Sequence, residues 1–311
     1  MNNILEVRNL GKNYATFSLK NVSFSVPTGY IMGFIGPNGA GKTTTIKSIL
    51  NMIGYPSGEI KIFGIDNTNH APPNKSEKNS AASKSGTIIR TADINDYIGI
   101  VMDAPFYVED WTMKDVEMAV SPFYSQWNHT KYDELLSSFN IDKKKKIKEL
   151  SRGMKVKLML AIALSHDAKL LILDEPTSGL DPVARDEFCD LLSEFMTDEE
   201  RSVLFSTHIT SDLEKIADYI TFILNGEIVF TGPKEELLEK YALIKGGLKD
   251  LAPEQKQFVI GLRTHETGFE GMIDVSDLSN LSRDITVEPI TLEEIIIFMN
   301  KGGSVKEYKN R

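Results

Sequence analysis

The sequence contains little cysteine and no long hydrophobic run. Cys189 is its single cysteine, which excludes an intramolecular disulfide and a cysteine-based zinc site and fits a reducing compartment. The longest apolar stretches, residues 170–173 and 295–299 among them, fall far short of the about 20 residues that a membrane-spanning helix needs. Residues 1–6 contain neither a charged leader nor an apolar signal core. These absences predict a cytoplasmic protein that reaches a membrane only through a partner.

An excess of positive charge is also missing. Lys and Arg number 35 against 44 Asp and Glu, a net charge of −9, which argues against a globally basic nucleic-acid binder. The one basic run, residues 143–146, is interpreted as solvated surface, with contact to anionic lipid headgroups as a lesser alternative. With 41% hydrophobic and 25% charged residues, the composition is typical of a globular protein with a sizeable core.

Alternating strand and helix patterns predict an α/β fold. Residues 170–173 are apolar at every position, as in a parallel strand buried on both faces, and Asn225-Gly226 between two apolar stretches predicts a hairpin. Asp181-Pro182 is typical of a helix start. Further strands are expected at 22–26, 30–35, 97–102 and 203–205, and helices at 42–52 and within 103–163. We expect a mostly parallel sheet with an antiparallel edge and a helical insertion.

Two segments differ from this pattern. Residues 66–93 are rich in Asn, Ser, Lys, Ala and Pro and are interpreted as an exposed, mobile insertion. The pattern also weakens beyond Glu235. We therefore expect a main domain at 1–235 and an accessory region at 236–311, a small mixed appendage that ends in a short helix at 292–300 and is either regulatory or passive.

An apolar strand leads into a glycine-rich loop that opens a helix, with the G-x-x-x-x-G-K-[ST] spacing of a phosphate-binding loop. Glycines let backbone N–H groups face phosphate oxygens, and the helix adds its positive N-terminus. Lys42 is expected to reach the β- and γ-phosphates in catalysis, and the Thr43 hydroxyl to ligate Mg²⁺. The predicted nucleotide contacts are Gly36, Pro37, Asn38, Gly39, Ala40, Gly41, Lys42, Thr43 and Thr44.

Two carboxylates, Asp174 and Glu175, follow the apolar stretch 170–173. The first is predicted to hold the Mg²⁺ hydration shell, and the second to polarise an attacking water as general base. Together with the phosphate loop, this pair predicts a nucleoside triphosphatase.

Leu150-Ser151-Arg152-Gly153-Met154 lies shortly before these carboxylates and resembles the signature of the ATP-binding cassette (ABC) ATPases, usually Leu-Ser-Gly-Gly-Gln. Ser151 and Gly153 match, whereas Arg152 and Met154 depart in a way similar to bacterial exporter ATPases of the ABC-2 type. The resemblance covers about residues 3–235. It implies a RecA-like P-loop fold with an antiparallel β subdomain and a helical subdomain at about 103–164, in which Ser151 and Gly153 bind ATP.

Other positions match the cassette pattern in order. Tyr14 stands where the family stacks an aromatic ring on adenine. Asp181 lies in a loop that crosses between subunits, although it can also be a simple helix cap. His208 matches the switch histidine, which implies contact with the γ-phosphate and orientation of the attacking water with Glu175. The remaining histidines, His70, His129, His166 and His265, are interpreted as structural.

Asp103 is the main departure, because the family usually has Gln there. We expect its carboxylate to join Asp174 and Glu175 in nucleotide and metal binding. Three carboxylates without a metal should raise the pKa of one of them and strengthen the Mg²⁺ requirement.

The resemblance implies ATP and Mg²⁺ as cofactors and a head-to-tail homodimer, or a heterodimer with a second ABC ATPase subunit, around two ATP. A separate polytopic membrane permease would dock on the helical segment, which carries Phe106, Tyr107, Trp111, Phe123, Tyr124 and Trp127. The protein would then act in export on the inner face of the cell membrane, with no nucleic-acid partner.

Two alternatives remain. A soluble cassette ATPase acting on ribosomes or DNA is disfavoured by the single cassette and the lack of heptads. A GTPase or kinase is disfavoured by the lack of an Asn-Lys-x-Asp motif.

Overall fold

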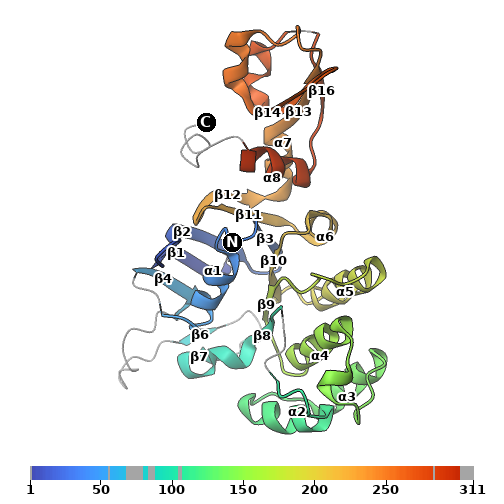
Figure 1. Cartoon of the computed structure of the whole chain (residues 1–311). Helices are drawn as coiled ribbons and strands as arrows, with labels where there is room; N and C mark the ends of the chain where they lie inside the picture. The colour runs from blue at the N-terminus through green and yellow to red at the C-terminus, as the bar shows by residue number, and fades with distance from the viewer. Residues whose placement is uncertain are drawn as a thin grey trace.

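A six-stranded sheet forms the centre of the molecule (Figure 1). The computed structural model describes residues 2–54, 57–67, 80–82, 88–103, 107–282 and 284–301. Neighbouring strands from β11 to β8 run parallel, and β12 pairs antiparallel at one edge, as predicted. The strand order is β12 (Glu227–Pro233), β11 (Tyr219–Leu224), β3 (Ile31–Ile35), β10 (Ser202–Thr207), β9 (Leu170–Asp174) and β8 (Ile98–Val101).

One face of this sheet packs against an antiparallel sheet and the helix α1 (Lys42–Ile49). Because successive strand residues point to opposite faces, Leu170 and Ile172 join this core, whereas Leu171 and Leu173 join the core on the other side. Burial on both faces explains why β9 is apolar throughout. The antiparallel sheet has the order β2 (Ser18–Pro27), β1 (Asn3–Asn13), β4 (Ser57–Ile62) and β5 (Ile65–Asp66).

Helices cover the opposite face of the central sheet. Phe188 and Leu192 of α5, Leu213 of α6 and Leu160 of α4 share one core with the strands. A smaller core holds α2, α3 and α4 together at one end of the molecule. The helices are α2 (Met113–Val120), α3 (His129–Ser138), α4 (Arg152–Leu164), α5 (Pro182–Phe195), α6 (Thr210–Ile216) and α7 (Lys234–Lys240), with the 3-10 helices η2 (Ser121–Phe123) and η3 (Ile147–Glu149).

The last part of the chain folds as a four-stranded antiparallel sheet with a helix, beyond β11 and β12 (Figure 1). The sequence predicted the final helix but not this sheet. Ile295 and Phe298 of the helix join the same core as Leu213 of α6, and the Leu292 amide donates to Glu214 Oε1 at 3.1 Å. The elements are β13 (Tyr241–Gly246), η4 (Pro253–Phe258), β14 (Val259–His265), β15 (Gly268–Asp274), η5 (Val275–Asn280), β16 (Thr286–Pro289) and α8 (Leu292–Lys301), in the strand order β14-β15-β13-β16.

The segment predicted to be a mobile insertion, 66–93, is described only in part, and residues 68–79 and 83–87 lie outside the described residues. Its described parts include an antiparallel pair, β6 (Ser80–Ala82) and β7 (Ile88–Arg90), and the start of the 3-10 helix η1 (Thr91–Tyr97). None of the helices in the described ranges has the length and apolar character needed to span a membrane.

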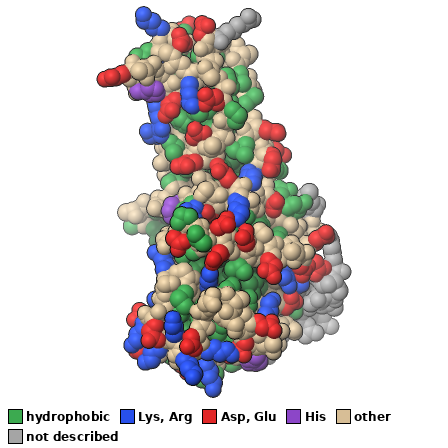
Figure 2. Space-filling view, turned by 90° about the vertical axis from the view of Figure 1, so that its right-hand side faces the viewer, with side chains coloured by type: hydrophobic (Ala, Val, Ile, Leu, Met, Phe, Trp, Pro, Cys, Tyr) green, Lys and Arg blue, Asp and Glu red, His purple; other side chains and the backbone are tan. Residues whose placement is uncertain are grey.

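Lys and Arg side chains gather at the end of the molecule formed by α2 and α3 (Figure 2). Within the basic run, Lys143 pairs with Asp133, and Lys146 lies 3.2 Å from Asp110. All four of these side chains are exposed, which fits the interpretation of this run as solvated surface.

Candidate nucleotide-binding and hydrolysis site

The predicted phosphate loop connects β3 to α1. Gly41 has a φ of +114°, and a Cβ there would lie 2.6 Å from Leu19 Cδ2. At Gly36 a Cβ would lie 2.3 Å from the Ile223 carbonyl oxygen, so both positions require glycine. The first turn of α1 contains no acidic side chain. The loop therefore presents a helix N-terminus suited to an anion.

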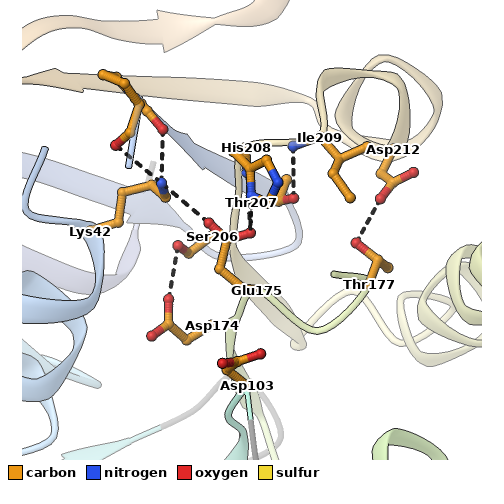
Figure 3. A network of polar contacts seen from close by, with 12 residues as sticks. Lys42, Asp103, Asp174, Glu175, Thr177, Ser206, Thr207, His208, Ile209 and Asp212 are labelled. Atoms are coloured by element: carbon orange, nitrogen blue, oxygen red, sulfur yellow. Dashed lines mark hydrogen bonds and ion pairs between the residues drawn. The ribbon is translucent and has the colours of Figure 1, made fainter. Parts of the chain in front are cut away.

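Lys42 is almost fully buried beneath this loop. Its Nζ donates to the Gly36 carbonyl oxygen at 2.7 Å and lies 3.2 Å from Glu175 Oε1 (Figure 3). The Lys42 side chain is 6% exposed and that of Glu175 15%, so this ion pair is little screened by water. The sequence-predicted cation and the sequence-predicted base are thus in direct contact.

Glu175 occupies a tight turn at the end of β9 with a φ of +52°, a conformation that non-glycine residues seldom adopt. Its second carboxylate oxygen, Oε2, lies 2.6 Å from His208 Nδ1 and also accepts from the His208 amide at 3.3 Å. His208 follows β10, the strand that pairs with β9. The neighbouring strand ends therefore bring the predicted base and the predicted switch histidine together.

Asp174 is 2% exposed at the last position of β9. Ser206 Oγ donates to its Oδ1 at 3.1 Å, and the Thr43 hydroxyl donates to the same carboxylate. Burial raises the pKa of Asp174 despite these hydrogen bonds, because desolvation disfavours the charged form. Oxygen donors from Asp174 and Thr43 fit Mg²⁺. The contact from Ser206 was not predicted, because it depends on strand pairing.

Asp103 does not join this carboxylate pair. Its Oδ1 lies 2.7 Å from Arg152 Nη2, and its side chain is 64% exposed. No group of three His, Cys, Asp or Glu side chains suited to a metal occurs in the described part of the chain. In this structure Asp103 therefore contacts Arg152, which stands at the position of the usual signature glycine. Its expected part in nucleotide and metal binding stays a prediction.

The signature segment lies against the loop before Asp181. Ser151 accepts from the Met154 amide at 3.2 Å and caps α4, as predicted. A Cβ on Gly153 would lie 3.6 Å from Leu180 Cδ2, and one on Gly179 would lie 3.0 Å from the Arg152 guanidinium. Asp181 caps α5 by accepting from the Val183 and Ala184 amides at 3.0 and 3.1 Å. Asp181 thus acts as a helix cap here.

Tyr14 lies in the turn between β1 and β2 with 47% of its surface exposed, so the adenine base of a nucleotide can reach its ring. Lys12 Nζ lies 5.4 Å from the ring centroid. A second aromatic ring of this turn was missed by the sequence reasoning: a Cβ on Gly41 would lie 2.8 Å from Phe17 Cζ. Phe17 therefore borders the phosphate loop, a contact that no local sequence signal indicates.

The family model for the ABC transporter ATPase domain, described as "ABC transporter", matches residues 19–178, just over half of the chain. The chain belongs to the ABC transporter family. Members hydrolyse ATP to power transport, and this chain is the nucleotide-binding subunit of a transporter. Such subunits work with membrane permeases. The resemblance drawn from the signature is confirmed.

The similarity to known proteins covers between about three quarters and nearly all of this chain. A putative ABC transporter ATP-binding protein of Mycoplasma pneumoniae is 30% identical, covering 99% of this chain and 91% of its own length. The lantibiotic transport ATP-binding protein SrtF of Streptococcus pyogenes is 32% identical over 73% of this chain and 89% of its own. Among solved structures, the ATP-binding subunit of an ABC transporter superposes with a TM-score of 0.62 and 25% identity, covering 75% of this chain and 91% of its own. The Clostridium perfringens protein cbiO1, part of the ABC transporter complex cbiONQ, superposes with a TM-score of 0.58 and 24% identity, covering 76% and 91%.

Proposed function

We propose that Glu175 is the general base of ATP hydrolysis. In this proposal Lys42 and His208 determine whether a carboxylate oxygen of Glu175 is free to accept a proton. In the structure Lys42 holds one Glu175 oxygen and His208 the other. A γ-phosphate above the loop competes for Lys42, since a polyanion attracts the ammonium more strongly than a single carboxylate does. Oε1 then becomes free to accept a proton from water while His208 keeps Oε2 in place. The resulting hydroxide attacks the γ-phosphorus, and ADP leaves.

In the same proposal, Thr43 and Asp174 would hold Mg²⁺, and the ion would supply positive charge against the phosphates. Backbone amides of the loop from Gly36 to Thr44 bind the phosphates, and Tyr14 stacks on the adenine.

We infer a head-to-tail dimer because the phosphate loop and the Ser151–Gly153 segment are two separate surfaces, each suited to phosphate. Ser151 and Gly153 begin α4 next to the Gly179–Asp181 loop, and the Ser151 hydroxyl and the helix N-terminus suit a phosphate. In the dimer this surface meets the ATP on the phosphate loop of a second ABC ATPase subunit, either identical or a sister chain.

We propose that the subunit drives export through a separate polytopic permease at the inner face of the cell membrane. The observation that carries this is similarity to the lantibiotic protein SrtF and to the bacitracin transport protein BcrA of Bacillus licheniformis, which is 31% identical over 77% of this chain and 73% of its own. The division into an ATPase domain at 1–235 and an accessory region at 236–311 belongs to the same proposal. Nucleic acid has no part in it.

The helical subdomain offers a surface for the permease. Phe123 is 79% exposed and Met118 on the adjacent helix α2 is 59% exposed, whereas Tyr107, Trp111 and Trp127 pack against the subdomain core. Phe106, which the sequence also suggested, lies outside the described residues. Exposed aromatic side chains are common at the centre of interfaces.

Capture from native membranes tests the proposal. Tagged chain carrying Glu175→Gln, solubilised in mild detergent with Mg-ATP, should retain a stoichiometric polytopic membrane protein. Phe123→Ser added to that chain should lose the partner, and Phe123→Ser in the otherwise unchanged protein should keep basal ATPase activity. Leu248→Ser, which removes another exposed apolar side chain, in the C-terminal region, should keep both. Recovery of only free protein, ribosomes or DNA in several detergents contradicts the transport assignment.

A further inference from the structure

A buried polar network lies directly behind Glu175. Two residues later, Thr177 is fully buried, and its Oγ1 donates to Asp212 Oδ2 at 2.7 Å (Figure 3). Asp212 is 5% exposed and belongs to α6, four residues after His208. Arg185 of α5 donates to Asp212 Oδ1 from Nη2 at 2.6 Å and from Nε at 3.1 Å. Asp212 therefore joins three segments, which carry Glu175, His208 and Asp181.

The geometry of this network is tightly determined. Both Asp212 oxygens have partners, and Arg185 Nη2 also donates to Ser211 Oγ at 2.8 Å. A buried carboxylate is tolerated only when it is paired and hydrogen-bonded, and the orientation of this one is fixed because Arg185 holds Oδ1 while Thr177 holds Oδ2. The α5–α6 contact thus holds one carboxylate oxygen at a defined place, where it accepts from Thr177, two residues after Glu175.

That turn requires external support. Glu175 holds a φ of +52°, a conformation that persists only where the surroundings enforce it. On one side the Glu175 amide donates to the Ser206 carbonyl at 2.8 Å, and on the other the Ser178 amide donates to the Glu175 carbonyl at 3.2 Å. The Thr177 hydroxyl adds a side-chain anchor to the helix that follows His208.

We propose that Asp212, with Thr177 and Arg185, is a positioning residue for hydrolysis, because it fixes the Glu175 carboxylate relative to His208. The proposal rests on the role of Glu175 as general base. The network also gives α5, which begins at Asp181, a rigid connection to the hydrolysis site. A displacement at the Asp181 loop would therefore move the base itself.

Replacement of the Thr177 hydroxyl tests this role. Thr177→Val keeps the shape of the side chain and removes its bond to Asp212, and should lower kcat about tenfold or more, since small misplacement of a reacting group is costly. The ATP concentration at half-maximal rate should change less than about threefold, because the phosphate loop is untouched. Thr177→Ser should restore most of kcat, and Asp212→Asn should behave like Thr177→Val.

Thr221→Val is the matched control, because Thr221 is equally buried and its hydroxyl contacts Thr231 and Met32, not the Glu175 turn. It should keep kcat. An equal loss of kcat in Thr221→Val, or unchanged kcat in both Thr177→Val and Asp212→Asn, overturns the positioning role.

A double variant separates this inference from the proposed function. Thr177→Val should cause no further loss in a Glu175→Gln background if the hydroxyl acts through Glu175. Full additivity of the two losses overturns the positioning role. If Glu175→Gln alone leaves kcat intact, the proposed base fails, whatever Thr177→Val does.

Discussion

At the scale of single residues, the candidate site is a cluster of charges held out of water. Lys42 and Asp174 are almost fully buried, and Glu175 is nearly so. Buried charges lower stability unless they are paired, and for Asp174 the hydrogen bonds and the charge of Lys42 do not fully offset the effect of burial on its pKa. The buried charges therefore lower the stability of the free subunit, but they suit the binding of phosphate and metal.

Asp174→Asn should raise the melting temperature of the metal-free protein at pH 7. Burial raises the pKa of Asp174, so the folded state holds this proton to a higher pH than the unfolded chain does. The stabilising contribution is complete below the unfolded pKa and is lost as the pH rises through the folded pKa. Thermal unfolding should show the gain at pH 7 and none near pH 3. A lower melting temperature for Asp174→Asn at pH 7 would contradict this.

Asp103→Gln should leave the Mg²⁺ dependence of ATP hydrolysis unchanged, because Asp103 pairs with Arg152. The pair is half-exposed or more on both sides, so its loss should cost less than about 1 kcal/mol of unfolding free energy. Titration of activity with Mg²⁺ checks this, with Asp174→Asn as the comparison that shifts the midpoint. A shifted midpoint in Asp103→Gln would restore the metal role that the sequence suggested.

At the scale of elements, short-range sequence patterns predicted the strands, helix caps and turns that interactions between neighbouring residues determine. The β9 strand, the cap of α5 at Asp181, the cap of α4 at Ser151 and the Asn225-Gly226 hairpin all follow from short-range patterns. The contacts of Asp103 with Arg152 and of Thr177 with Asp212 join residues 49 and 35 positions apart. Such contacts depend on tertiary packing, and for this reason the sequence did not reveal them.

His166, at the junction between α4 and β9, should make the free energy of unfolding depend on pH. His166 lies there, stacked on Tyr124 at a ring distance of 3.9 Å, and its Nδ1 contacts the Asp96 carbonyl. Burial lowers the pKa of His166 to about 4. Between pH 6.5 and 4 the proton binds only the unfolded chain, so the free energy of unfolding should fall by about 3 kcal/mol as the pH drops.

Chemical denaturation across this pH range tests the effect of His166. His166→Phe, which keeps the stacking, should flatten the pH dependence, whereas His265→Gln at an exposed position should leave it unchanged. An unaltered pH dependence in His166→Phe would contradict the assigned cause.

At the scale of the whole molecule, the C-terminal region shares its core with the ATPase domain. Leu292, Ile295, Phe298 and Met299 of α8 belong to the same buried cluster as Leu213 of α6 and Phe205 of β10. The sequence left open whether this region is passive. Its packing on the helix that follows His208 favours a structural link to the hydrolysis site.

Phe298→Ala should therefore destabilise the ATPase domain by about 3–5 kcal/mol, the cost of removing a buried aromatic ring. Both tryptophans, Trp111 and Trp127, lie in the helical subdomain, so tryptophan fluorescence during urea unfolding reports that distant part. Asn300→Ala, at an exposed position of α8, is the control. An unchanged tryptophan-monitored midpoint in Phe298→Ala would show that the C-terminal region is passive.

The central claim is that two chains enclose ATP between the phosphate loop of one and the Ser151 segment of the other, with Glu175 ending the cycle by hydrolysis. The most direct measurement is the molar mass of Glu175→Gln by light scattering after gel filtration at saturating Mg-ATP. The account predicts about 34.8 kDa without nucleotide and about twice that mass with it. A mass that stays near 34.8 kDa while ATP is bound would contradict the homodimer, and a failure to gain mass in the presence of a sister ABC ATPase subunit as well would contradict the account.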